Sequence, residues 1–189
     1  MIAFPGCRNK SDNKTEVITP VSVSTGIPDT VLISRIFEAS LNGQLSQLKN
    51  LIDGGFDVNT RDKDGSTALM YAAYNGHVDV MRELILKGAS INLQDSNGRT
   101  ALMMASSGPF PAAVKILLDH QADPNITDRD EHFSALMYAA AEGQLEVVRI
   151  LLANRADPAL KDIDGDDAER FAKNNGHKEI VALLQSVKK

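Results

Sequence analysis

The side chains in this chain that could carry chemistry are few and lie far apart in sequence. Among its 189 residues there is one cysteine, Cys7, and four histidines, His77, His120, His132 and His177. A zinc site or a histidine-activated nucleophile needs several such groups in one place. One thiol also cannot form an internal disulfide. We therefore predict that the protein is not an enzyme, that it has no metal site and that it uses no cofactor.

One acidic segment resembles the start of a calcium-binding loop. It reads Asp162-Ile163-Asp164-Gly165-Asp166. A helix–loop–helix calcium site needs glycine at the sixth loop position and a bidentate glutamate at the twelfth. Here the glycine stands fourth and the twelfth residue is Lys173. We interpret the segment as an ordinary turn.

Composition narrows the classes of partner. The chain is 43% hydrophobic and 24% charged, with a net charge of -5 and a pI near 5.3. Binding to phosphate backbones needs clustered lysine and arginine, so we predict no nucleic-acid partner. The longest apolar runs are too short for the roughly 20 residues of a membrane-spanning helix. We therefore predict no membrane span.

The N-terminal segment, residues 1–28, is rich in Ser, Thr, Lys, Asn and Pro. Such a composition buries too little apolar area to offset the entropy of ordering, so we predict a disordered tail. Its start, Met1-Ile2-Ala3-Phe4-Pro5-Gly6-Cys7, resembles the end of a bacterial lipoprotein signal, although a basic start and a longer apolar run are missing. Two interpretations stay open. Cys7 is a chance residue of the tail in a cytoplasmic protein that starts at Met1, or it is a lipid attachment site in a periplasmic or envelope-tethered protein.

A repeat supplies the elements that would position any site. The segment that starts at Asp62 recurs 33 residues later at Asp95, again at Asp128 with one extra residue, and again at Asp162. Upstream landmarks such as Gly43 show the same spacing. Self-similarity at this period is typical of solenoid proteins. We divide residues 29–189 into five units, at about 29–61, 62–94, 95–127, 128–161 and 162–189.

Each unit follows one local pattern. A turn precedes a residue that can cap a helix, and a short alanine-rich segment follows it. A second segment carries apolar residues at helical spacing, such as Val80, Met81 and Leu84. A helix pair of this size cannot bury its apolar side alone and must stack on a copy of itself. The pattern therefore predicts an all-α solenoid of helix–turn–helix units with short β-hairpin-like turns. We expect the polar first and last units to act as caps and the protein to be a monomer.

These residues resemble the ankyrin-repeat family, in a style typical of bacterial members. The second unit matches the family pattern at Gly65, Thr67, Leu69, Ala72, Ala73, Gly76, His77, Leu84, Gly88, Ala89 and Asn92. The units depart from it where Ala68, Ala101 and Ala135 replace a proline and where Met70, Met103 and Met137 replace a histidine.

The resemblance implies a concave surface of turn tips and first helices that binds a partner protein. Positions on that face that differ between units are the candidate binding residues: Lys63, Ser66, Tyr74, Asn75, Ser96, Arg99, Ser107, Phe110, Arg129, His132, Phe133 and Glu142. Phe110 lies at a proline-flanked corner. Phe133 is either a plug folded back on the turn or an exposed anchor.

Two functions are consistent with these expectations. The first is an adaptor or inhibitor that holds an unidentified protein through the concave face. The alternative is a membrane-tethered structural spacer or accessory protein in the cell envelope.

Overall fold

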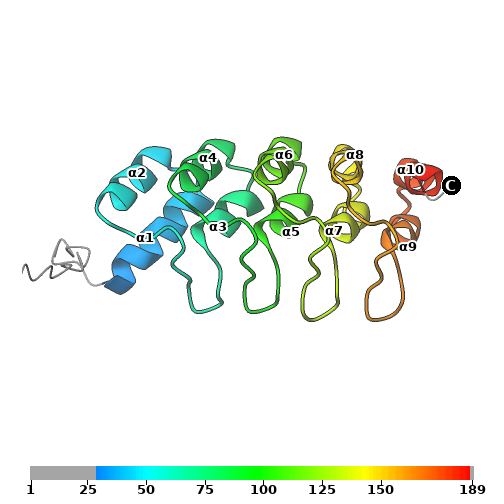
Figure 1. Cartoon of the computed structure of the whole chain (residues 1–189), viewed down its shortest axis with the longest axis horizontal. Coiled ribbons are helices and arrows are strands. Elements are labelled where there is room, and N and C mark those ends of the chain that lie inside the picture. The colour runs from blue at the N-terminus through cyan, green and yellow to red at the C-terminus, as the bar shows by residue number, and fades with distance from the viewer. Residues whose placement is uncertain (1–28, 188–189) are drawn as a thin grey trace, which may run out of the picture.

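The computed structural model describes residues 29–187, and within that range the chain folds into ten helices stacked in pairs (Figure 1). In chain order the helices are α1 (Asp29–Leu41), α2 (Leu45–Asp53), α3 (Ala68–Tyr74), α4 (Val78–Leu86), α5 (Ala101–Ser106), α6 (Pro111–Asp119), α7 (Ala135–Ala141), α8 (Leu145–Ala153), α9 (Ala168–Asn174) and α10 (Lys178–Val187). The all-α repeat solenoid expected from the sequence is confirmed. The predicted N-terminal tail, with Cys7, lies outside the described residues.

The helices form two parallel rows. The inner row is α1, α3, α5, α7 and α9, and the outer row is α2, α4, α6, α8 and α10; each helix contacts its neighbours in its own row and its partner in the other (Figure 1). Long hairpin loops project from the inner row on the side away from the outer helices (Figure 1). The inner helices and the hairpins thus make one continuous face.

Small residues allow the inner helices to pack closely. Ala72, Ala105 and Ala139 are fully buried, as are the larger side chains of Met81 and Leu117 in the outer row. A leucine-sized side chain buried in this way contributes roughly 1.5–3 kcal/mol to folding. The core therefore runs along the whole stack instead of forming a single centre.

The inner helices start where the sequence places their caps. Thr67 Oγ1 accepts a hydrogen bond from the Met70 amide at 3.4 Å, and Met70 Sδ accepts one from the Thr67 amide at 3.4 Å. Thr100 with Met103 repeats this exchange. The methionines that replace the family's histidine thus close a reciprocal cap through sulfur.

An aspartate organises each hairpin turn. Asp62 Oδ1 accepts hydrogen bonds from the amides of Asp64 (2.9 Å) and Ser66 (2.8 Å). Asp162 Oδ1 does the same for Asp164 (3.0 Å) and Asp166 (2.7 Å). The acidic segment that resembles a calcium loop is therefore built as a turn. Across residues 29–187 the structure gathers no group of three His, Cys, Asp or Glu side chains that could hold a metal ion.

Asparagines connect each unit to the next. Asn59 Nδ2 donates to the Gly88 carbonyl at 3.1 Å, and its Oδ1 accepts from the Ser90 amide at 2.8 Å. Asn92 and Asn125 make the same pair of bonds one and two units further on. This series of paired bonds, the asparagine ladder, fixes the spacing of successive loops.

None of the helices in the described range is long and apolar enough to cross a membrane.

Candidate functional site: a groove between the second and third units

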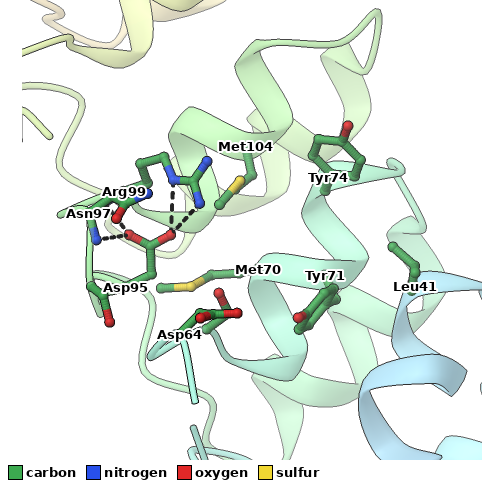
Figure 2. Close-up of a pocket in the computed structure, with 11 residues that line it drawn as sticks. Leu41, Asp64, Met70, Tyr71, Tyr74, Asp95, Asn97, Arg99 and Met104 are labelled. Carbon is green, nitrogen blue, oxygen red and sulfur yellow. Dashed lines mark hydrogen bonds and ion pairs between the residues drawn. The ribbon is translucent and has the colours of Figure 1, made fainter. Parts of the chain in front are cut away.

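A hollow of about 540 Å3 opens on the face made by the inner helices and the hairpins. We call it the groove; it lies mainly between the second and third units, and Figure 2 shows its walls. Its lining residues are Leu41, Asp64, Ser66, Met70, Tyr71, Tyr74, Asp95, Ser96, Asn97, Arg99 and Met104.

An ion pair forms one side of the groove. The Asp95 side chain is only 1% exposed, and its Oδ2 lies 2.9 Å from both Nε and Nη2 of Arg99. Asp95 Oδ1 accepts from the amides of Asn97 (3.0 Å) and Arg99 (2.8 Å). The guanidinium is therefore held in one orientation while 39% of the Arg99 side chain stays exposed (Figure 2).

Two tyrosines from α3 form another side. The Tyr71 hydroxyl donates to Asp62 Oδ2 at 2.6 Å, and the ring packs on Phe37 with centroids 5.3 Å apart. The hydrogen bond to Asp62, helped by burial and by the nearby carboxylates, raises the pKa of Tyr71 to about 12. Tyr74, one turn further along α3, is 55% exposed. The groove therefore combines a fixed aromatic ring with one that is free to contact another molecule.

The remaining walls mix apolar and acidic character. Met104 is half-buried, and Leu41 reaches the groove from the end of α1. Methionine adapts its shape to what it touches. The Asp64 side chain is 68% exposed near the hairpin tip. An aromatic ring, a guanidinium and apolar surface together are the groups that anchor protein interfaces.

Four of the candidate residues from the sequence line this groove: Ser66, Tyr74, Ser96 and Arg99. The other candidates, which do not line it, are Lys63, Asn75, Ser107, Phe110, Arg129, His132, Phe133 and Glu142. Asn75 lies close by, since its Nδ2 donates to the carbonyl of Leu41 at 2.7 Å.

Ser66 has little surface to offer a partner. It is 8% exposed, although its place in the turn predicts an open position. Its amide donates to Asp62 Oδ1 and its carbonyl accepts from the Asp62 amide at 3.0 Å. Closing the hairpin draws this residue inward.

Phe110 is partly buried and packs against the core between the second and third units. Its ring lies so close to Gly76 and Gly108 that a Cβ atom at either glycine would come within 2.3 Å of it. His77 lies over Gly43 in the same manner, and its Nε2 bonds the Leu41 carbonyl at 2.9 Å. Phe110 therefore takes the place that a histidine fills between the first and second units, without a ring nitrogen to bond the chain.

Phe133 packs between the first helices of the fourth and fifth units. The ring lies edge-to-face against Tyr138 and Phe171, with centroids 5.7 and 4.9 Å away. The ring is half-buried and packs on the next unit as well as on its own. Its neighbour His132 is exposed. It stands where the other turns have a glycine and has a positive φ of 59°.

Several groove residues were not predicted from the sequence, including Leu41, Tyr71 and Met104. Tyr71 and Met104 stand at the same position of their units, where the fourth has Tyr138. A comparison of helix positions between units would have marked that site as variable. Leu41 belongs to the preceding unit, and no pattern within one unit points to it.

Comparison with known families gives one finding. A family profile described as ankyrin repeats, in three copies, matches residues 36–128, 84–162 and 111–188. A search of curated proteins gave no match.

Proposed function

Because the chain belongs to the ankyrin-repeat family, we propose that it holds a partner protein, as an adaptor or inhibitor, in the groove between its second and third units. Ankyrin repeats are generally protein–protein interaction modules, and proteins built from them are generally not enzymes. The observation that carries the proposal is the groove itself, whose walls include an exposed tyrosine, Tyr74, and a fixed guanidinium, that of Arg99.

The groove is suited to binding because two of its polar side chains are already fixed in place. Arg99 is held by Asp95, and Tyr71 is held by Asp62. A partner would therefore order few side chains on this surface, and more of the contact energy would remain as affinity. Such a preorganised surface suits an adaptor or inhibitor, whose task is to hold its partner.

Tyr74 provides the sharpest test. Partners would be recovered from cells with the full chain, purified singly, and measured against wild type, Tyr74→Ala and Leu86→Ala. Leu86 is the matched control, since it is 79% exposed at the end of α4 in the outer row. We expect Tyr74→Ala to weaken the binding of a true partner about tenfold or more, because Tyr74 would act as an aromatic anchor. Leu86→Ala should leave the affinity unchanged.

A partner that binds Tyr74→Ala as tightly as wild type, or that is lost with Leu86→Ala, would contradict this location. Thermal unfolding of each variant shows whether the array stays folded. Both replaced side chains are largely exposed, so we expect little change in stability.

A further inference from the structure

A second hollow, of about 490 Å3, lies against the hairpins next to the groove. Its lining residues are Arg61, Asn92, Leu93, Gln94, Asp95, Ser96 and Arg129. The middle of this set belongs to the loop that enters the third unit. Arg61 comes from the loop before it and Arg129 from the loop after it, so the hollow joins three successive loops, whose residues belong to the first four units.

Both arginines are anchored by backbone carbonyls of the middle loop. Arg61 Nη1 donates to the Gln94 carbonyl at 2.7 Å and more weakly to the Gly65 carbonyl at 3.4 Å. Arg129 Nη1 donates to the Ser96 carbonyl at 3.0 Å. These bonds occupy one nitrogen of each group. A guanidinium has five N–H donors, so each arginine keeps donors for a further acceptor.

In the part of the chain that the structure describes, the two arginines are held by carbonyl oxygens and not by carboxylates. Within residues 29–187, neither Arg61 nor Arg129 forms an ion pair with a carboxylate. Asp95 lines the hollow, but its side chain is 1% exposed and is neutralised by Arg99. A carbonyl oxygen positions a guanidinium without cancelling its charge. The hollow therefore has two arginines without an ion pair to any described residue, and its one carboxylate, that of Asp95, is already paired with Arg99.

We propose that this hollow binds a phosphate group between the guanidinium groups of Arg61 and Arg129. A phosphate monoester carries a charge of about −2 at neutral pH, which matches two unneutralised cations. The planar fork of arginine fits phosphate oxygens with paired hydrogen bonds. Ser96, which is exposed, also lines the hollow. The phosphate is either free in solution or attached to a phosphorylated side chain.

The hollow shares Asp95 and Ser96 with the groove, but phosphate binding does not depend on the partner proposed for the groove. Its first test is a titration of the full chain with inorganic phosphate at constant ionic strength, followed by amide resonances in NMR spectra. We expect saturable shifts for residues 94–97 and 129. Arg61→Gln and Arg129→Gln should each weaken phosphate binding about tenfold, since each removes a charge-assisted contact. The double variant should show no saturation.

Arg149→Gln is the matched control, because Arg149 is an exposed arginine of the outer helix α8. It should bind phosphate as wild type does. Equal loss in Arg149→Gln, unchanged affinity in the double variant, or the same shifts with chloride alone would overturn the proposal.

A second variant guards against a failure of the double variant to fold. Ser96→Glu places a carboxylate at the hollow. This carboxylate should form an ion pair with the arginines, which would raise the melting temperature and compete with phosphate. Ser96→Gln supplies the same size without the charge and should do neither. Wild-type phosphate affinity in Ser96→Glu would count against the site. O-phosphoserine then identifies the source: tighter binding than inorganic phosphate indicates a phosphorylated side chain, and equal binding indicates the free ion.

Discussion

At the scale of single residues, Ser106 stands out because its buried hydroxyl group makes no hydrogen bond to any residue that the structure describes. Its hydroxyl is fully buried and is the one side-chain oxygen or nitrogen in the described range that is buried without a hydrogen-bond partner. The second and fourth units have alanine at this position, Ala73 and Ala140. The third unit thus buries a polar atom where its neighbours bury a methyl group.

Replacement of Ser106 by alanine should stabilise the protein. We expect Ser106→Ala to raise the free energy of unfolding by about 1 kcal/mol, because an unsatisfied buried hydroxyl is removed. Ser40→Ala is the control, since Ser40 occupies the equivalent place in α1 and donates to the Ile36 carbonyl at 2.8 Å. Urea unfolding compares the two. A larger gain in Ser40→Ala than in Ser106→Ala would show that the missing bond is not the cause.

Tyr71 should link stability to alkaline pH. Its pKa is raised to about 12 from an ordinary value near 10, chiefly by the hydrogen bond to Asp62. The neutral hydroxyl is favoured in the folded state, so its contribution is complete below pH 10 and is lost as pH rises towards 12.

Tyr71→Phe should therefore cost about 1 kcal/mol at neutral pH, a modest value because the site is partly exposed. The difference from wild type should shrink above pH 10. Urea unfolding at several pH values measures it. Tyr138 is the natural reference: burial, aided by its bond to Asp128, raises its pKa further, and it remains intact in the variant. A constant difference from pH 7 to 12 would rule out this linkage.

At the scale of elements, the loops after the outer helices differ in strain. Gly55 and Gly88 have φ values of 93° and 91°, which glycine adopts freely. Gln121 and Arg155 stand at the same place with φ of 66°, where a side chain costs energy. The two later loops are therefore less relaxed than the two earlier ones.

Gln121→Gly should raise the free energy of unfolding by roughly 0.5–1 kcal/mol, because relief of the left-handed strain exceeds the added flexibility of the unfolded chain. Gly88→Ala is the reverse experiment and should lower the free energy of unfolding by a similar amount, because alanine is strained at a φ of 91°. No atom lies within 4 Å of a Cβ added there, so a steric clash would not add to the loss. Thermal and urea unfolding measure both. A loss of stability in Gln121→Gly would mean that the side chain makes a compensating contact.

The sequence predicts the helices far better than the details of the face. The starts of α3, α5, α7 and α9 each follow from a capping residue, and in α3, α5 and α7 small apolar residues come directly after it; both are local features. The position of Phe110 depends on glycines of two different units, and the hold on Arg129 depends on a carbonyl of the preceding loop. Patterns within one unit do not specify which long side chain crosses to a neighbour. The groove, which needs adjacent units, was therefore predicted only in part.

At the scale of the whole molecule, cooperativity depends on the bonds between units. Asn92 donates to the Gln121 carbonyl at 3.1 Å and accepts from the Asp123 amide at 2.9 Å. In a stack where each unit contacts only its neighbours, these bonds couple the folding of one unit to that of the next. Asn92→Ala should cost about 2 kcal/mol, one for each hydrogen bond.

The same variant should broaden the urea transition, with a lower m-value, if the halves of the array begin to unfold separately. Ser90→Ala is the control, because Ser90 is exposed and uses only its amide in the asparagine ladder. A loss of stability with an unchanged m-value would show that other contacts suffice to keep the stack cooperative.

The asparagine ladder also bears on how such a chain can change its length over generations. Each of its bonds joins residues 29–32 positions apart, so each links a unit only to the one that follows. Duplication or deletion of one whole repeat would leave each remaining asparagine with a bonding partner in the unit that follows it. The stack could thus become longer or shorter by whole repeats, whereas an insertion of half a repeat would interrupt the series of asparagine bonds.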